Sequence, residues 1–388
     1  MALSRTAPEH MSLATKLARI NWVIVLLLCL TASIGFALLY SAASTSAGQG
    51  SLDPWASRQM SRFAVGLGLL LFGAAVDVRV WLRYAYALYV LSLLLLVAVE
   101  VMGHIGGGSQ RWLEFGAMRV QPSEIVKVTL VLALARYFHR TSPEKVGRVL
   151  YLVPPLILVA LPAYLVLRQP DLGTAMMLLL MSGAMFFLGG VRVWKFVAAG
   201  VAGLVAVPVV WLKVLKPYQQ QRILSFVNPE SDPLGAGYHI LQSKIALGSG
   251  GIAGKGFLQG TQSHLSFLPE QQTDFIFTIL AEEFGIMGGL ALLVCYIGLV
   301  VYGIGIALRS RNQFGRLLAM GLTVNFFLYA FINMGMVMGI LPVVGVPLPL
   351  VSYGGTAMLT LMFGFGLIMS VYIHRDAQIS RHDSSHPG

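Results

Sequence analysis

Long apolar blocks separated by short polar stretches make up most of the chain. The blocks lack the two-residue alternation of apolar and polar positions that marks a half-buried strand. Most are close to the length of about 20 residues that a helix needs to cross a bilayer. The pattern predicts about ten membrane-spanning helices, at 20–40, 62–77, 83–102, 121–138, 149–167, 172–189, 194–214, 274–307, 316–340 and 351–373. We therefore expect an all-α polytopic membrane protein.

Three regions lie outside or between these blocks. Residues 1–19 are expected to be a cytoplasmic N-terminal segment, 20–374 a single transmembrane domain, and 375–388 a polar, disordered cytoplasmic tail. The longest interruption, 215–273, is predicted to be an external loop between the seventh and eighth helices. Within it, Tyr238–Gly248 is typical of a short amphipathic helix at the membrane surface.

Composition supports a membrane protein and limits the kinds of partner that we expect. Only 11% of the residues are charged and 56% are hydrophobic, whereas a soluble protein has about 25% charged residues. The net charge is +11, but most Lys and Arg lie in short loops that are cytoplasmic if the N-terminus is cytoplasmic, as the positive-inside rule expects. We therefore expect no nucleic-acid partner. Cys29 and Cys295 lie far apart in apolar blocks and indicate neither a disulfide nor a zinc site.

Asp274 lies where a polar run becomes the eighth apolar block. An acid at a membrane face costs about 2–4 kcal/mol, so it is a candidate for chemistry, with a helix-terminal acid as the structural alternative. Glu282 and Glu283 follow in the same block, about 12–13 Å deeper along an unbroken helix. They could form a structural ion pair or support a polar cavity.

Three more ionisable residues lie within or beside predicted spans. Glu124 and Lys127 are three positions apart, so they share a helix face and are expected to form a buried ion pair or to line a polar cavity. Asp171 begins the sixth span, where an acid caps free amides; a role in holding a cation or orienting Lys127 is the alternative.

External residues offer candidate ligands for an anion. Arg111 beside Trp112 combines a planar fork with a stacking face, suited to a phosphate or sugar, although both residues also suit an interfacial anchor. The glycine-rich stretch Gly248–Gly260, which includes Lys255, could present backbone amides to an anion or could simply be flexible.

Several motifs occur together in a fixed order. They are Gln121-Pro-Ser-Glu, Gln169-Pro-Asp-Leu-Gly-Thr, Asn228-Pro-Glu-Ser-Asp-Pro, Leu268-Pro-Glu-Gln-Gln-Thr-Asp-Phe-Ile-Phe and Pro349-Leu-Val-Ser-Tyr-Gly-Gly-Thr. In these motifs the chain resembles the SEDS family (shape, elongation, division, sporulation) over nearly all of residues 20–375. The Asn-Pro-Glu-Ser-Asp-Pro run and the Met-Ser-Val-Tyr-Ile-His-Arg ending most resemble the elongation members.

The resemblance implies a peptidoglycan glycosyltransferase that polymerises lipid II at the outer face of the cytoplasmic membrane, with both termini inside. It implies a class B penicillin-binding protein and other membrane proteins of the elongation machinery as partners. The family's essential acid falls on Asp274. The chain departs from many members at Gln271 and Gln272, where they have a basic residue or His before the Thr-Asp pair.

The substrate suggests the chemistry. Lipid II holds its sugar in the α configuration and the glycan product is β-1,4 linked, so a single inverting displacement is sufficient. We expect Asp274 to act as general base on the acceptor hydroxyl. The leaving pyrophosphate requires positive charge, for which a divalent cation, Mg²⁺ or Mn²⁺, is a candidate cofactor. The external basic residues are further candidates: Arg111, Arg222, Lys244 and Lys255.

Two other functions fit the same residues. A flippase that moves lipid-linked sugars could use Glu124, Lys127, Glu282 and Glu283 along a polar pathway. A non-catalytic scaffold that only recruits the penicillin-binding protein would tolerate changes at all of these positions.

Overall fold

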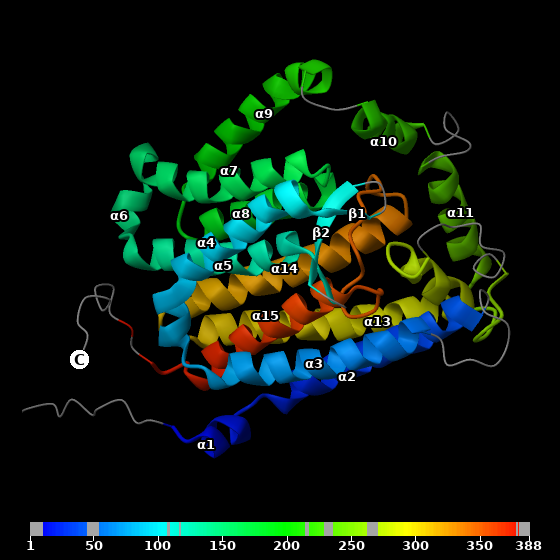
Figure 1. The fold of residues 1–388 in the computed structure, drawn as a ribbon, viewed down its shortest axis with the longest axis horizontal. Coiled ribbons are helices and arrows are strands. Elements are labelled where there is room, and N and C mark those ends of the chain that lie inside the picture. Colours follow the sequence, from blue (N-terminus) through cyan, green and yellow to red (C-terminus); the bar gives the residue numbers. More distant parts are fainter. Residues whose placement is uncertain are drawn as a thin grey trace, which may run out of the picture.

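The computed structural model describes residues 11–44, 54–106, 109–115, 118–213, 217–228, 236–261, 271–377 and 379. Long helices run side by side in one bundle (Figure 1). The helices are α1 (Leu13–Ala18), α2 (Trp22–Ser44), α3 (Pro54–Ala75), α4 (Val78–Met102), α5 (Pro122–Arg140), α6 (Pro143–Val146), the 3₁₀ turn η1 (Val149–Leu152), α7 (Val153–Arg168), α8 (Leu172–Leu188), α9 (Val193–Lys213), α10 (Pro217–Val227), α11 (Ala236–Ser249), α13 (Ile276–Arg309), α14 (Gln313–Val337) and α15 (Gly355–Ile373).

The predicted all-α membrane fold is confirmed. A described helix overlaps each predicted span, because an apolar segment in a bilayer must satisfy its backbone groups internally. Among the described residues, six helical segments are long and apolar enough to cross a membrane: α2, α4, η1 with α7, α13, α14 and α15; α8 and part of α9 are shorter apolar helices. The count of ten crossings stays a prediction.

Helices α14 and α15 form the centre of the bundle. In their most apolar windows 67% and 72% of the residues are buried, against 28% in α4. Helix α3 packs closely on α15, where Gly73 and Gly366 face each other and a Cβ on Gly73 would lie 3.2 Å from the Gly366 Cα. Small residues allow such close backbone approach between membrane helices.

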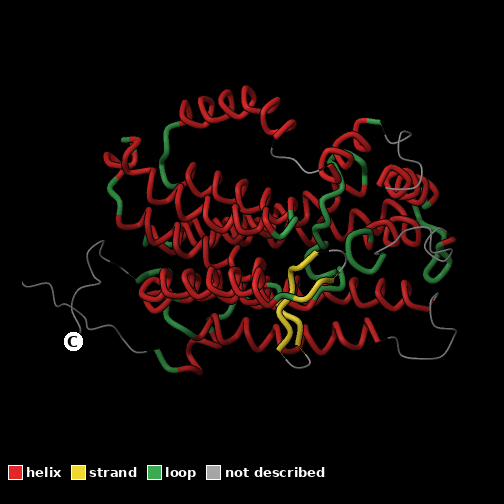
Figure 2. The backbone as a smooth tube through the Cα atoms, turned by 45° about the horizontal axis from the view of Figure 1, so that its top comes forward, coloured by secondary structure: helices red, strands yellow, loops and turns green. Residues whose placement is uncertain are grey.

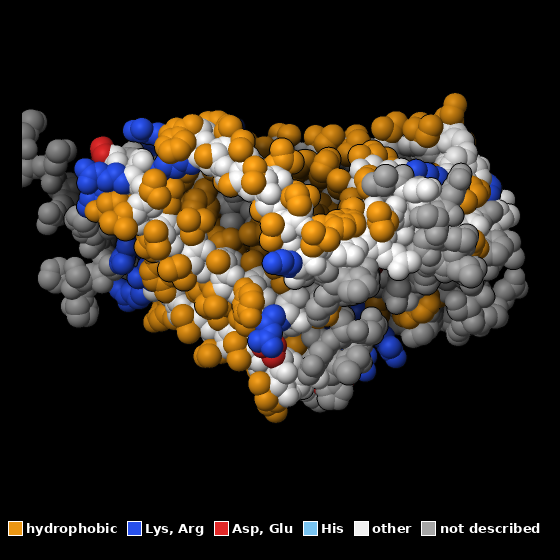
Figure 3. All heavy atoms as spheres, turned by 90° about the horizontal axis from the view of Figure 1, so that it is seen from above, with side chains coloured by type: hydrophobic (Ala, Val, Ile, Leu, Met, Phe, Trp, Pro, Cys, Tyr) orange, Lys and Arg blue, Asp and Glu red, His pale blue; other side chains and the backbone are white. Residues whose placement is uncertain are grey.

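A small antiparallel sheet, which the sequence did not predict, lies between α4 and α5 (Figure 2). Its strands are β1 (His104–Gly106), β2 (Ser109–Phe115) and β3 (Met118–Val120), in the order β1-β2-β3. We call this end of the bundle the sheet end. The described terminal residues lie at the opposite end (Figure 1), where Lys and Arg side chains also gather (left in Figure 3).

Helix α13 is broken rather than straight. Gly285 has φ 62° and ψ −157°, which divides the helix into a short arm, 276–284, and a long arm, 286–309. The Phe277 ring lies 3.7 Å from a Cβ built on Gly289, although residues twelve apart in an unbroken helix are separated by about 18 Å. The two arms are therefore folded back on each other.

Contacts along the short arm give its direction. Asn333 donates to the Asp274 carbonyl, whereas Thr278 contacts Ser243, which bonds the carbonyl of Val337, the last residue of α14. The short arm therefore runs with α14 toward the sheet end. The prediction that Glu282 and Glu283 lie deeper than Asp274 is wrong, because the break at Gly285 reverses the chain and leaves them nearer that end.

The region 215–273, predicted to be a long external loop, contains helices among its described residues. The predicted helix at 238–248 is confirmed as α11, which packs on α13 and α14. Helix α9 stands apart from the other helices (Figure 1), and its large apolar side chains, such as Val197, Val201 and Leu204, are exposed.

Candidate active site

The segment before α13 is held by hydrogen bonds to three consecutive carbonyls, those of residues 272–274. The first accepts from the Tyr353 amide at 2.8 Å, the second from the Ser352 hydroxyl, and the third, that of Asp274, from Asn333 Nδ2 at 2.9 Å. Each donor belongs to α14 or to the loop that follows it. The backbone of Asp274 is therefore fixed against the centre of the bundle.

The Asp274 side chain is partly exposed and lies against Gly345. Its Oδ2 atom would be 3.3 Å from a Cβ built on that glycine, whose φ is +71°. Asn333 also donates to the carbonyl of Val346 at 2.7 Å, so one amide side chain joins the two segments. The carboxylate thus rests on backbone that only glycine occupies without strain.

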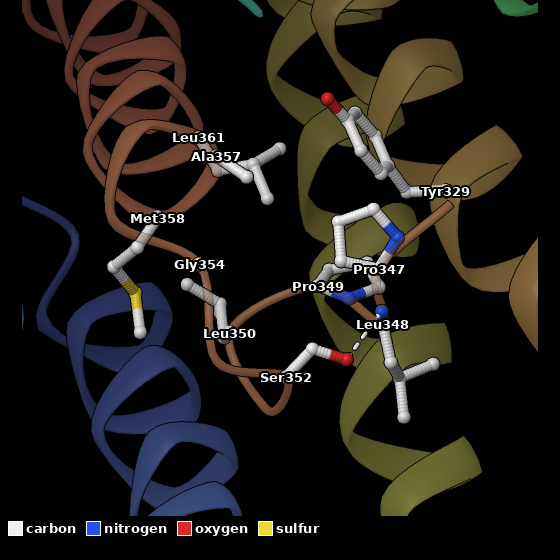
Figure 4. A pocket seen from close by; sticks show the side chains of 10 residues that line it. All are labelled: Tyr329, Pro347, Leu348, Pro349, Leu350, Ser352, Gly354, Ala357, Met358 and Leu361. Carbon is white, nitrogen blue, oxygen red and sulfur yellow. Dashed lines mark hydrogen bonds between the residues drawn. The ribbon is translucent and has the colours of Figure 1, made fainter. Parts of the chain in front are cut away.

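The loop 338–354 between α14 and α15 is non-helical, and its residues 347–350, 352 and 354 line a small pocket (Figure 4). Ser352 accepts from the Leu348 amide at 2.7 Å within the loop, and the Tyr296 hydroxyl donates to the Pro349 carbonyl at 2.7 Å. Tyr329 lines the opposite wall of the pocket. These contacts make the loop a structured wall rather than a loose connection.

A buried triad lies on the far side of Tyr329. Lys127 Nζ is 2.6 Å from Glu124 Oε1, and the Tyr329 hydroxyl donates to Glu124 and accepts from Lys127. The Lys and Glu side chains are 1% and 4% exposed, so the ion pair predicted from their spacing is confirmed. Because each charge has polar partners, its burial is tolerated.

Asp171 caps α8, as its position predicted. Its two oxygens accept from the Thr174 amide and hydroxyl, each at 3.0 Å. Arg111 lies 3.6 Å from Asp171 and donates to the Gln169 carbonyl at 3.2 Å and to that of Pro170. Arg111 therefore fastens the sheet to the turn between α7 and α8. Trp112, next to it on β2, is partly exposed.

The remaining predicted cations lie elsewhere. Lys255 Nζ is 2.7 Å from the buried Glu282, and Ser41 of α2 donates to Glu283. Lys244 on α11 lies against Gly339, just beyond α14. The backbone of α10 includes Arg222, whose side chain lies outside what the structure describes.

The structure adds Arg62 on α3, which the sequence analysis missed. Its guanidinium lies 4.5 Å from the centre of the Tyr353 ring and 3.1 Å from a Cβ built on Gly355. Its Nη1 atom is buried and has no hydrogen-bond partner among the described residues. A basic residue at the sheet end of a predicted span, away from the other loop cations, was the available signal.

The side chains do not form a protein-held metal centre in the described part of the chain. No three His, Cys, Asp or Glu residues there come together as metal ligands. Asp274 lies against the loop at Gly345, and one carboxylate does not make such a centre.

These features define a polytopic membrane protein in which a partly exposed carboxylate, on backbone held by hydrogen bonds, lies beside a structured loop of a helix bundle. The chain belongs to the FtsW/RodA/SpoVE family, described as cell cycle proteins, whose family model matches residues 21–377. The predicted SEDS membership is thereby confirmed.

Relatives of established name support this placement. The chain is 47% identical over 343 residues to the peptidoglycan glycosyltransferase MrdB of Escherichia coli (strain K12), covering 87% of this chain and 91% of that protein. It is 34% identical over 363 residues to stage V sporulation protein E of Bacillus subtilis (strain 168), covering 92% and 98%.

Two solved structures resemble the whole fold. A peptidoglycan synthase complex that coordinates polymerisation and crosslinking has a chain with a TM-score of 0.78 and 31% identity, covering 94% of this chain and 99% of that one. The rod shape determining protein RodA of Thermus thermophilus has a TM-score of 0.68 and 28% identity, covering 92% and 98%.

Proposed function

We propose that the chain is a peptidoglycan glycosyltransferase of cell elongation, which polymerises lipid II into β-1,4 glycan strands with Asp274 as general base. The observation that supports the assignment most directly is the hydrogen-bonding of three consecutive carbonyls, which holds Asp274 in place. A general base is effective only when it is held within hydrogen-bond reach of the proton it removes. The similarity to MrdB agrees with the activity.

In this reaction the acceptor hydroxyl attacks the anomeric carbon of the donor sugar from the face opposite the pyrophosphate. Asp274 accepts the hydroxyl proton as the new bond forms, which contributes about 10²–10⁴-fold in rate. The configuration inverts from α to β, and the lipid pyrophosphate departs with the electron pair of the broken bond. No covalent enzyme intermediate is required.

The leaving pyrophosphate needs positive charge. Arg62 fits this role because its Nη1 is buried without a hydrogen-bond partner among the described residues, beside the loop that holds Asp274. Trp112, partly exposed on the sheet, offers a stacking face for a sugar, whereas the Arg111 guanidinium is already engaged by Asp171 and two carbonyls. Lys244 and Arg222 are further basic residues of the region between α9 and α13.

The lipid tail requires an apolar surface open to the bilayer. Helix α9 exposes apolar side chains and stands apart from the bundle (Figure 1), and the space-filling view shows apolar surface around a hollow beside it (Figure 3). We assign the tail to this side of the molecule. The polyisoprenoid would then remain in lipid while the sugars reach the sheet end.

The orientation that we propose for the chain in the membrane rests on its charge distribution. Lys and Arg gather at the end opposite the sheet (Figure 3), and the positive-inside rule assigns that end to the cytoplasm. Both described termini are then cytoplasmic, and Asp274 faces outward, where the glycan is assembled. We propose a class B penicillin-binding protein as partner, in keeping with the similar chain from a complex that couples polymerisation to crosslinking.

Strand synthesis by the purified chain tests the assignment. Asp274→Asn should abolish polymer formation from lipid II, with and without the partner, while Asp376→Asn, an exposed acid at the opposite end, should retain it. Polymer at the wild-type rate from Asp274→Asn would refute the general base. Lipid movement in vesicles without polymer, stopped by Lys127→Met, would favour the flippase instead.

A further inference from the structure

The break in α13 leaves backbone amides and carbonyls without helical partners, and a distant segment supplies those partners. We call residues 250–256, which directly follow α11, the clamp. Four hydrogen bonds join the clamp to the break: Lys255 N to Glu282 O at 3.0 Å, Gly256 N to Glu283 O at 3.0 Å, Ile286 N to Gly251 O at 3.0 Å and Met287 N to Ile252 O at 3.2 Å. The clamp thus replaces the interrupted helical bonds on both sides of Gly285.

Glycines make this approach possible. A Cβ on Gly250 would overlap the carbonyl of Ala281, and one on Gly254 would overlap that of Glu283. Gly254 has φ +81°, and Gly285 has φ +62° with a Cβ position 2.6 Å from the Ile252 carbonyl oxygen. The clamp and the break can therefore approach this closely only because these positions have no side chain. This explains the glycine-rich composition of the clamp without invoking flexibility.

An ion pair reinforces the same junction. Lys255 Nζ lies 2.7 Å from Glu282 Oε1, and the Thr261 hydroxyl lies 2.8 Å from that Nζ and 3.2 Å from the same carboxylate oxygen. The Glu282 side chain is fully buried (0% exposed), whereas Lys255 is 26% exposed. The next residue, Glu283, accepts a hydrogen bond from the Ser41 hydroxyl of α2. The outer end of the short arm is therefore held by charge as well as by backbone bonds.

The short arm connects this junction to Asp274. Its inner end is held by the bonds to residues 272–274, and its outer end by the clamp, about 12 Å away. Without the clamp the arm can tilt and strain the three bonds at its inner end, and a tilt of about 5° displaces one end relative to the other by about 1 Å over that length. A displacement of about 1 Å at a reacting group costs about 100-fold in rate.

We propose that Lys255 and Glu282 are positioning residues, which fix the outer end of the short arm and so direct the Asp274 carboxylate. The inference rests on the proposed function of Asp274. It assigns Lys255 a role different from that of a pyrophosphate ligand, because its ammonium is already engaged by Glu282 and Thr261. It also explains why an acid is buried beside the helix break.

The test uses the full chain and its polymerisation of lipid II, with kcat and KM measured separately. Lys255→Met should lower kcat by about 10–100-fold and leave the KM for lipid II within about twofold. Lys255→Arg, which keeps the ion pair, should restore most of kcat. Lys145→Met, an exposed lysine at the opposite end, is the matched control and should behave as the wild type.

A second variant keeps the test decisive if Lys255→Met folds poorly. Glu282→Gln keeps the size of the side chain and removes its charge, so it should fold, and it should lower kcat with KM unchanged.

Other outcomes overturn the inference. A rise in KM with kcat preserved in Lys255→Met would make that lysine a substrate ligand. Wild-type kinetics in both Lys255→Met and Glu282→Gln would leave the ion pair with no part in catalysis. Either result with an inactive Asp274→Asn refutes only the positioning role, whereas an active Asp274→Asn refutes the general base itself.

Discussion

Gly345 tests whether the Asp274 carboxylate must lie where the structure places it. Replacing this glycine with Ala adds one methyl carbon 3.3 Å from Asp274 Oδ2, closer than ordinary van der Waals contact. The oxygen belongs to a segment whose carbonyls are held by hydrogen bonds, so the side chain must yield by a few tenths of an ångström. The substitution therefore displaces the proposed base without removing any of its atoms.

The magnitude follows from two separate costs. Ala at a φ of +71° is less favourable than Gly by about 1–2 kcal/mol, which lowers stability. A displacement of about 1 Å costs about 100-fold in rate, so a few tenths of that distance should cost about 5–10-fold in kcat. The KM for lipid II should change little, because the methyl group faces the carboxylate rather than the cations.

Gly190 provides the control. It also has positive φ, +93°, but a Cβ there meets nothing within 4 Å, and it lies between α8 and α9. Gly190→Ala should lower the melting temperature about as much as Gly345→Ala and keep the wild-type kcat. Initial rates of glycan formation and thermal unfolding of both variants decide the matter. Equal kcat in the two variants would show that the position of Asp274 does not limit the reaction.

Two further substitutions address the neighbouring groups. Tyr329→Phe should destabilise the protein by about 1–3 kcal/mol, because Glu124 and Lys127 lose a buried hydroxyl partner; unchanged thermal unfolding would mean that the triad is not coupled. Arg62→Gln should lower kcat/KM for lipid II by about 10–100-fold, the range of one charge-assisted hydrogen bond, with part of the loss in kcat because the pyrophosphate gains charge as it leaves; wild-type kinetics would contradict pyrophosphate binding by Arg62.

The features that the sequence predicted correctly are local ones. Apolar blocks form helices because the bilayer offers the backbone no other partners, so the helices could be located from the positions of these blocks along the chain. The Glu124–Lys127 pair and the Asp171 cap depend on separations of three residues within one helix. The same reasoning placed Asp274 at the start of α13, although Phe275 occupies the N-cap position itself.

The features that the sequence analysis missed depend on contacts between segments far apart in the chain. The β2 stretch, Ser109–Phe115, does not alternate clearly between apolar and polar residues, and only pairing with β1 and β3 makes it a strand. Gly285 lies in a mostly apolar segment that suits a continuous helix, and glycine within such a pattern is tolerated. Its break depends on the clamp about 30 residues earlier in the chain, which no local pattern indicates.

The break also explains how an acid can be placed inside the bundle from the sheet end. A continuous helix would leave Asp274 at its end, whereas a short arm that turns back at Gly285 places Asp274 beside α14 and next to the loop 338–354. Irregular backbone at membrane depth is tolerated only where protein or water covers it. Here the hydrogen bonds to residues 272–274 satisfy the backbone at one end of the short arm, and those of the clamp satisfy it at the other end. The groups that satisfy the interrupted backbone are therefore the same groups that hold the proposed base, so stability and catalysis are coupled at this junction.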